Sequence, residues 1–265
     1  MKRIAMIAVG LLAAHTASAG VYAELFDHNL TTNSSQLKQK MYVQGGNGRI
    51  VDAEGRATII KDGTLYIVDD SDKTYVVFDK PTMEKLAKNL NEGMAQVKEQ
   101  LAKLPPEQRA QAEAQMGPAA AALLHGGEQQ WTVDVKDTGK SDKVDGRACK
   151  LWDVTRNGEL DEQICVVPYS AMPGKEDLQK VFGSFARSFE EMAKSVPMLS
   201  GMMANEFSAY AKTNGYPVRQ RNYENGKLSD EETVVKVWRE EAVPASMFEV
   251  PTGYTKKSMP VGPGQ

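Results

Sequence analysis

The sequence predicts an α+β protein in which helices are inserted between the strands of a curved antiparallel sheet. Two blocks, 41–79 and 131–167, consist of short apolar runs cut by turn signals, as in a β-meander. Each block is followed by a segment with helical spacing of apolar residues, about 81–125 and 175–212. Strands joined by tight turns pair antiparallel, and the chain lacks the alternating βαβ units of a parallel sheet. Helices placed between two meanders would pack on one face of a single sheet.

The first 19 residues have the pattern of a secretory signal peptide. Lys2 and Arg3 precede an apolar run over 4–14, and Ala17-Ser18-Ala19 forms a small-residue cleavage site before Gly20. The run is too short to cross a bilayer of about 30 Å as a helix, and no cysteine follows it that could carry a lipid. We therefore expect a soluble, periplasmic protein with no integral membrane segment after signal cleavage.

Length and charge limit the class of the mature chain. Without residues 1–19, 246 of the 265 residues remain, which suits one large α+β domain over 20–265. Two smaller domains divided near Gly126-Gly127 are the alternative. With Lys2 and Arg3 removed, 30 basic residues face 35 acidic ones, a formal charge of −5. Because a phosphate backbone attracts basic tails or patches, and none is present, we expect no nucleic acid partner.

The first meander predicts a series of short strands. Its clearest hairpin joins 56–61 to 64–68 through Asp62-Gly63, because Asp-Gly supplies the positive φ angles of a two-residue primed turn. Both faces of these strands carry apolar side chains, so both faces should be at least partly covered. The remaining strands of this half are predicted at 21–27, 36–44, 49–51 and 74–78.

Helical period begins after this meander, at Pro81, which suits a first helical turn. Apolar residues then recur every three or four positions, at Met83, Leu86, Leu90, Met94, Val97, Leu101 and Leu104. Pro105-Pro106 ends the helix, and we expect its apolar stripe to pack against the meander. A second, alanine-rich helix is predicted over 107–116, before Gly117-Pro118, with a further short segment over 119–124.

The second half of the chain repeats this order. The predicted strands of the second block are 131–136, 147–155 and 159–167. A helix follows with Leu178, Val181, Phe182, Phe185, Phe189 and Met192 on one face, and a further helix is predicted over 199–210. Two closing strands, 217–223 and 233–239, are joined across Asn225-Gly226, and a short apolar segment occupies 246–251.

Cys149 and Cys165 are the only cysteines, and both lie in predicted strands of an exported chain, where oxidation is permitted. If Arg156-Asn157-Gly158 is a three-residue hairpin loop, the two cysteines face each other directly across the strands. Directly opposed residues have the Cβ separation that disulfides use. A redox-active pair is the alternative, but the sequence has no Cys-x-x-Cys motif. We therefore predict a structural disulfide.

The sequence offers no recognisable catalytic or metal-binding motif. His28 and His125 lie outside any nucleophile motif, and with the two cysteines they do not form a zinc ligand set of standard spacing. The acidic run 69–72 lacks the glycine and distal glutamate of a calcium loop and is interpreted as a solvated turn. We expect no enzyme, no cofactor and no metal. A carboxylate pair brought together by folding would instead support a glycosidase.

Methionine and phenylalanine are concentrated in the helical segments. Thioethers bind cuprous copper, methionine also fills irregular cores, and a Met- and Phe-rich face can line an adaptable apolar pocket. Ordinary core packing is the plainer interpretation, and the copper site and the pocket are the functional ones. The candidate pocket residues are Met94, Val97, Phe182, Phe185, Phe189, Met192, Met202 and Met203.

Parts of the chain resemble known families. Gly48-Arg49-Ile50, the segment 62–69 and Lys73-Thr74-Tyr75 resemble the front sheet of the LolA-like superfamily, periplasmic carriers of lipoproteins between membranes. The ending 244–254 is similar to that of an uncharacterised exported bacterial family, domain of unknown function 4412. The resemblance implies an incomplete, half-open β-barrel wrapped around helices, with an apolar cavity between them. It does not imply carrier activity, because the middle of the chain is unlike those carriers.

These features lead to an expected function. We expect a non-catalytic periplasmic protein that binds an apolar ligand, a lipid or an envelope protein or lipoprotein in a cavity between sheet and helices. The alternative is an envelope interaction or assembly protein with an ordinary packed core, which binds other chains through its surface. An enzyme ranks third.

Overall fold

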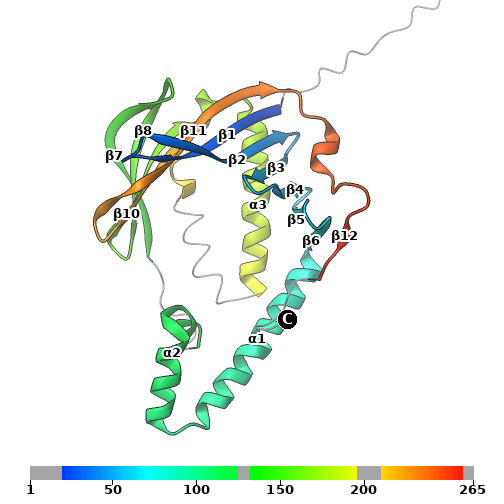
Figure 1. Cartoon of the computed structure of the whole chain (residues 1–265), viewed down its shortest axis with the longest axis vertical. Helices are drawn as coiled ribbons and strands as arrows, with labels where there is room; N and C mark the ends of the chain where they lie inside the picture. The colour runs from blue at the N-terminus through cyan, green and yellow to red at the C-terminus, as the bar shows by residue number, and fades with distance from the viewer. Residues whose placement is uncertain (1–19, 125–131, 196–209, 259–265) are drawn as a thin grey trace, which may run out of the picture.

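The computed structural model describes residues 20–124, 132–195 and 210–258 (Figure 1). The predicted signal peptide and most of the helix predicted over 199–210 fall outside these ranges. Within them, none of the helices is long and apolar enough to cross a membrane.

The described strands form a single twelve-stranded sheet. From one edge to the other its strands are β12 (Thr255–Lys256), β6 (Thr74–Phe78), β5 (Thr64–Asp69), β4 (Arg56–Lys61), β3 (Asn47–Asp52), β2 (Ser34–Gln44), β1 (Gly20–Asn29), β11 (Lys227–Glu241), β10 (Gly215–Glu224), β9 (Glu159–Pro168), β8 (Arg147–Arg156) and β7 (Val133–Val144). The two predicted blocks are therefore joined through the pairing of β1 with β11, the first and the last long strand.

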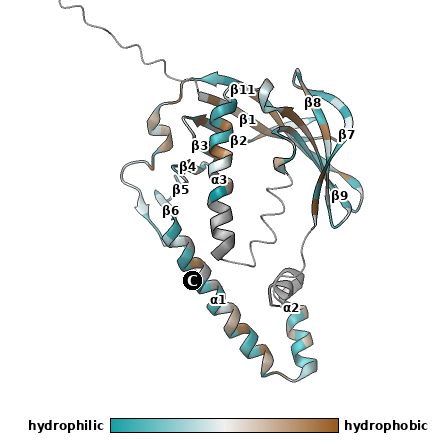
Figure 2. Ribbon diagram, turned by 180° about the vertical axis from the view of Figure 1, so that it is seen from behind, coloured by the Kyte–Doolittle hydropathy of each residue, from teal (hydrophilic) through white to brown (hydrophobic). Residues whose placement is uncertain are grey.

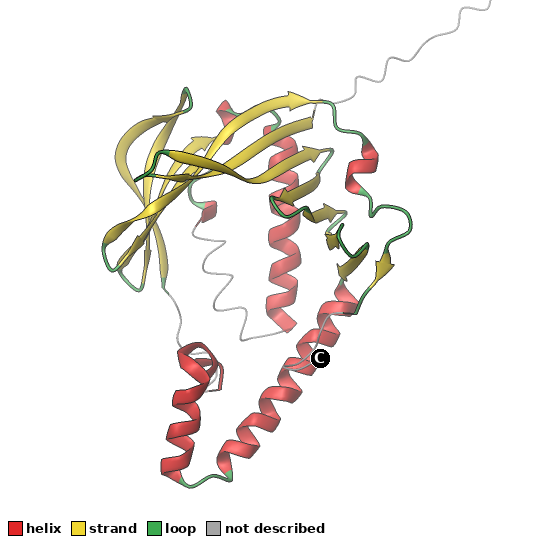
Figure 3. Cartoon of the chain, in the orientation of Figure 1, coloured by secondary structure: helices red, strands yellow, loops and turns green. Residues whose placement is uncertain are grey.

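The sheet is curved and open, as Figure 3 shows. Its neighbouring strands pair antiparallel except β12, which pairs parallel with β6. The predicted fold class, a curved antiparallel sheet with helices inserted between its strands, is confirmed (Figure 3). Register shifts interrupt the pairing of β1 with both of its neighbours, and bulges of this kind increase local twist.

Tight hairpins connect many of the strands, and their turn residues explain why. Asp62 and Gly63 have φ angles of 48° and 77°, so Lys61 pairs with Thr64 directly across the two-residue turn. Asn225-Gly226 also has positive φ at both positions. Glycine and asparagine tolerate this left-handed conformation, and the resulting twist matches that of the strands. The Asp62-Gly63 hairpin is confirmed.

Strand β7 is longer than the pattern predicts. The apolar alternation ends near Lys136, but pairing with β8 resumes after a register shift between Asp137 and Ser141 and continues to Val144. The exposed second half of the strand is polar, so it carried no hydrophobic signal.

Two helices follow β6. Asp79 caps α1 (Lys80–Ala102) by accepting a hydrogen bond from the Thr82 amide at 2.9 Å, and Pro81 occupies the first turn. Helix α2 (Pro106–Leu124) continues through Gly117-Pro118, so the predicted break there is wrong. Arg109 of α2 donates to the carbonyls of Leu101 and Ala102 at 2.9 and 3.2 Å. These carbonyls lie in the last turn of α1, where the helix itself supplies no hydrogen-bond donor.

Helix α1 does not cover the meander as expected. It begins directly after β6, contacts that strand and α3 (Lys175–Ser195), and leads away from the sheet (Figure 1). Hydrophobic and hydrophilic residues are mixed along its length (Figure 2). Helix α3 takes the predicted place instead and contacts β2 and β3. A helix that starts at the last strand of a meander can reach the other strands only by folding back, which α1 does not do.

The main core lies between α3 and the sheet. Leu178 and Val181 of α3 are buried against β1, β2 and β4, where Val21, Val43 and Ile60 are also buried. Gly48 of β3 permits this close packing, because a Cβ at this position would lie 2.9 Å from Cγ1 of Val181. We call this face of β2–β6 the inner face.

A second core covers the opposite, outer face of the meander. The tail 243–257, which includes the 3₁₀ helix η2 (Ala245–Phe248), places Val243 and Phe248 over Ala57, Ile59 and Val68. Arg49 is buried there and donates to the Met247 carbonyl at 3.3 Å. The expectation that both faces of the meander are at least partly covered is confirmed, with α3 on the inner face and the C-terminal tail on the outer face.

Candidate functional site

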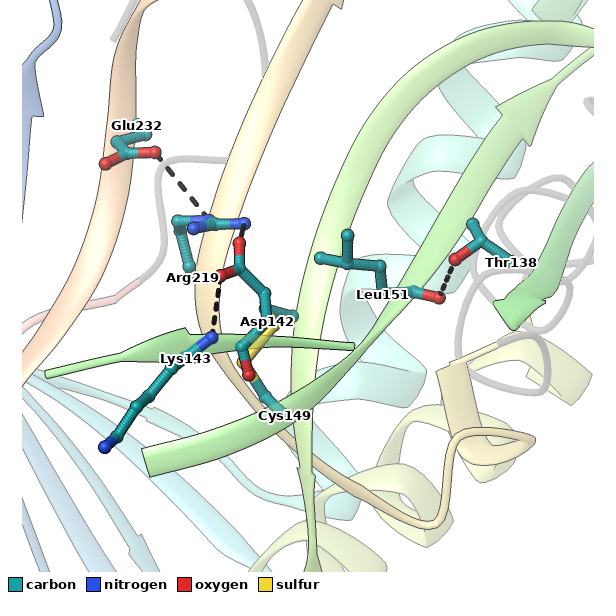
Figure 4. The surroundings of a disulfide bond; sticks show 8 residues. Thr138, Asp142, Lys143, Cys149, Leu151, Arg219 and Glu232 are labelled. Atoms are coloured by element: carbon teal, nitrogen blue, oxygen red, sulfur yellow. Dashed lines mark hydrogen bonds and ion pairs between the residues drawn. A yellow bond between two sulfur atoms is a disulfide. The ribbon is translucent and has the colours of Figure 1, made fainter. Parts of the chain in front are cut away.

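The disulfide is the first predicted site that the structure contains. Cys149 and Cys165 are joined, with a Cα–Cα distance of 5.4 Å, and both are buried (Figure 4). The predicted register is wrong, however. Cys165 pairs with Leu151, because Arg156 pairs with Glu159 across a two-residue turn and the strands shift near Val154. The bond therefore joins diagonal neighbours on one face. Disulfides of this kind persist in oxidising compartments.

A buried polar network lies beside the disulfide. Arg219 of β10 donates from Nη2 to Oδ2 of Asp142 at 2.8 Å, and its Nε lies 3.8 Å from Oε2 of Glu232 (Figure 4). Arg221 donates to the same Glu232 oxygen at 2.6 Å. A hydrogen bond from the Lys143 amide, followed by the one from Arg219, lowers the pKa of Asp142. The network ties β7, β10 and β11 together, although Nε of Arg219 is buried without a hydrogen-bond partner among the described residues.

The two faces of the meander differ in how well they are buried. On the outer face, Val68, Ile59 and Ala57 are fully buried beneath the tail. On the inner face, strand register groups Ile67 with Val76, and Leu65 with Phe78. Leu65, Val76 and Phe78 are only half-buried, and Ile67 is 39 % exposed. The incompletely buried apolar surface of β5 and β6 therefore faces the side on which α3 packs.

A hollow of about 400 Å³ opens at the edge of this surface, between β6, the start of α1 and the end of the tail. We call it the edge hollow. Its apolar wall comes from β6 and α1, and its polar rim comes from α1 and the tail. The lining residues are Val76, Val77, Pro81, Thr82, Lys85, Leu86, Lys256, Lys257 and Ser258.

Of the described residues that line the edge hollow, three are lysines and none carries a carboxylate. Lys257 is paired with Asp72 at 3.3 Å, while neither Lys85 nor Lys256 forms an ion pair with any residue that the structure describes. The nearby carboxylate of Asp79 is engaged in capping α1. Hydrogen bonds from the Thr82 hydroxyl and amide lower the pKa of Asp79, and the charge of Lys256 lowers it further. The hollow therefore combines an apolar wall with a positive rim.

The predicted pocket residues do not line the edge hollow, and their assignment to a pocket stays a prediction. Met94 and Val97 are half-buried on α1. Phe182 packs in the main core, with its ring 5.8 Å from that of Tyr216, which in turn lies 5.1 Å from Trp238. The side chains outside the described part of the chain are those of Phe185, Phe189, Met192, Met202 and Met203.

The edge hollow was missed because its parts are far apart in the sequence. Val76, Pro81 and Lys85 belong to one segment, but Lys256 and Lys257 lie about 170 positions later and arrive only through the pairing of β12 with β6. The adjacent lysines Lys256 and Lys257 were the one sequence feature that could have indicated a positively charged site. Nothing local indicates which strand it joins.

Of the two histidines considered for catalysis, His28 forms an ordinary surface contact and His125 lies outside the described residues. His28 Nδ1 lies 2.9 Å from Ser35 Oγ, to which Lys236 donates at 2.7 Å. Lysine bases in enzymes are desolvated, whereas Lys236 is exposed, so this contact is a surface hydrogen bond. Asp69 accepts bonds from the hydroxyl and amide of Ser71, as a solvated acidic turn does. Across the described ranges, no three His, Cys, Asp or Glu side chains gather as metal ligands would.

Comparison with known proteins places the chain in a family. Residues 83–254 match the family model described as a domain of unknown function (DUF4412), and the chain belongs to that family. The match covers the helices, the second β block and most of the tail. No curated protein matches the chain.

Two solved structures illustrate what the fold is similar to. An uncharacterized conserved protein from Thermus thermophilus has a TM-score of 0.43 and 8 % identity, covering 91 % of this chain and 90 % of that one. The Pseudomonas aeruginosa MucA/MucB complex has a TM-score of 0.34 and 11 % identity, covering 89 % of this chain. The chain spans 56 % of that second neighbour.

Proposed function

We propose that this protein is a non-catalytic periplasmic binder of an apolar ligand, a lipid or an envelope lipoprotein, held between the sheet and the helices of a half-open, LolA-like barrel. One observation carries the proposal. The inner face of β5 and β6 keeps its apolar side chains half-buried or exposed, with Ile67 39 % exposed. On the outer face of the same strands Val68 and Val77 are buried, beside the half-buried rings of Tyr66 and Tyr75.

The difference in burial between the two faces supports ligand binding, because folded chains ordinarily bury apolar side chains such as those of the inner face. Fully burying one Val, Leu, Ile or Phe side chain contributes about 1.5–3 kcal/mol, so a chain that can bury such a face usually does. Here the tail shields the outer face, whereas Ile67, Val76 and Phe78 stay accessible on the side of the helices. Contiguous exposed apolar surface of this kind marks binding sites in soluble proteins.

A neutral fluorescent probe, N-phenyl-1-naphthylamine, tests this proposal in the full-length mature protein. We expect Ile67→Asp to weaken probe binding several-fold. Leu228→Asp is the matched control, because Leu228 is a large hydrophobic residue of similar exposure, 42 %, on the β10–β11 hairpin. Both sites are exposed, so stability should change by no more than about 0.5 kcal/mol.

Native mass spectrometry of gently purified protein provides an independent measurement. Bound lipid that is lost in Ile67→Asp and kept in Leu228→Asp would support the proposal. Absence of both bound lipid and probe binding in the unaltered protein would contradict it.

The alternative, an envelope interaction or assembly protein, draws on a different observation. Helix α1 leads away from the sheet and α2 turns back toward it (Figures 1 and 2). Many side chains of both helices are exposed. An arm of this kind suits contact with another chain. Site-specific photo-crosslinking from Gln111 on α2, an exposed position, would capture a defined partner in this case and none if the protein carries only small ligands.

A further inference from the structure

We propose that the ligand is an anionic amphiphile whose charged head, a carboxylate or a phosphate, lies at the lysines of the edge hollow while its hydrocarbon chain lies on the inner face of β5 and β6. This inference rests on the proposed function and names the class of ligand for the same surface. It is drawn from the lining of the edge hollow, where apolar side chains and lysine ammonium groups lie together.

Val76 connects the hollow to the inner face. It is one of the lining residues, and it is also paired with Ile67 across β5 and β6, so that both side chains lie on the same face. Phe78 lies two positions further along that face and is half-buried. A chain entering past Val76 would thus run over apolar surface without a polar interruption from these strands.

The three lysines of the rim outnumber the two nearby carboxylates, those of Asp72 and Asp79. Lys85 belongs to α1 and Lys256 to β12, where it is paired with Tyr75, and neither forms an ion pair with a described residue. Lys257 is paired with Asp72 at 3.3 Å, and Asp79, which accepts a hydrogen bond from the Thr82 amide, keeps its negative charge near Lys256. Ammonium groups next to low-dielectric surface attract anions more strongly than isolated surface lysines do, because less water screens them.

The volume of the hollow limits how much of a ligand it can hold. About 400 Å³ is near the lower end of the 300–1,000 Å³ range of ligand pockets. The hollow suits a head group and the first part of one chain, with the remainder on the inner face. The three lysines would repel a cationic head group. A neutral ligand would form no ion pair with them and would gain no affinity from their charge.

Isothermal titration calorimetry with dodecyl phosphate, below its micelle concentration, tests the inference. Dodecanoate tests whether a carboxylate head is preferred to phosphate, and dodecyl maltoside serves as the neutral probe of equal chain length. The variant is Lys85→Glu/Lys256→Glu. The control Lys98→Glu/Lys140→Glu makes the same change of net charge at exposed lysines of α1 and β7 that do not line the hollow.

We expect the anionic probes to bind more tightly than dodecyl maltoside, and the hollow variant to weaken them about tenfold while the control variant leaves them unchanged. Raising the salt concentration from about 0.05 to 0.5 M should weaken anionic binding only. Equal binding of all three probes, or equal loss in both variants, would overturn the inference yet leave the proposed function standing. No binding of any probe would overturn both.

Discussion

Arg219 of β10 bonds Asp142 of β7 at 2.8 Å, although β9 and β8 lie between these strands in the sheet. Arg147 of β8 similarly reaches the Val235 carbonyl of β11 at 3.3 Å. Contacts that skip two strands require the sheet to curl sharply, so that side chains meet across its concave side. The polar network and the disulfide together fix this curled half.

The Asp142 contact makes stability depend on pH. Because the folded pKa of Asp142 is lowered, its contribution is present above the unfolded pKa of about 3.9 and is lost as pH falls through the folded value. Asp142→Asn should cost about 1 kcal/mol at pH 7, a figure discounted because the side chain is 41 % exposed. Urea unfolding at pH 7 and at pH 3 should show the difference from the unaltered protein shrinking in acid.

Asp134 provides the control for Asp142. It lies on the same strand and pairs with Lys212 at 3.0 Å, but both side chains are more than half exposed. Asp134→Asn should therefore cost less than Asp142→Asn. An equal cost would show that burial of Arg219 adds nothing.

Removing the disulfide should lower stability substantially. The bond closes a sequence separation of 16 residues, for which chain entropy predicts about 3 kcal/mol. Cys149→Ala/Cys165→Ala should lower the free energy of unfolding by about that amount, measured by urea denaturation. Reduction of the unaltered protein should reproduce the effect. Two alkylated thiols in unreduced, denatured protein would contradict the assignment.

Gly48 should tolerate no side chain while α3 keeps its position. Gly48→Ala places a methyl group 2.9 Å from Cγ1 of Val181, and overpacking of this kind costs about 1–3 kcal/mol. Combining it with Val181→Ala should cost less than the two changes added, a coupling that thermal unfolding would reveal. Gly93→Ala in α1 is the control. Among the described residues, no atom beyond the helix's own backbone lies within 4 Å of the added Cβ, so this change should stabilise the helix by about 0.5–1 kcal/mol.

The C-terminal tail should act as a shield for the outer face. Phe248 is buried over that face, so Phe248→Ala should cost about 3 kcal/mol in urea unfolding. Glu249→Ala, which removes only the exposed pair with Lys61, should cost little. Probe binding should rise in Phe248→Ala, because a second apolar surface opens. If both variants behave alike, the tail does not shield the outer face.

Local signals in the sequence predicted the hairpins well. Asp62-Gly63 and Asn225-Gly226 join strands where expected, because positive φ angles are a property of a few adjacent residues. The disulfide partners were also found, since only two cysteines exist. Their register was wrong for two reasons: Asn157-Gly158 forms a two-residue turn where a three-residue loop was predicted, and a further shift near Val154 depends on how both strands twist within the whole sheet.

The sequence by itself determined the class of the fold, through periodicity and local turn chemistry, and the pairing of Cys149 with Cys165, because the chain has only two cysteines. The family followed from the resemblance of the segment 244–254. Only the tertiary structure decided that α3 rather than α1 packs on the inner face, and that Lys256 lies beside Lys85. Both outcomes depend on contacts between residues distant in the chain. Such contacts are selected by the packing of the whole sheet, in which β1 pairs with β11 and β12 with β6.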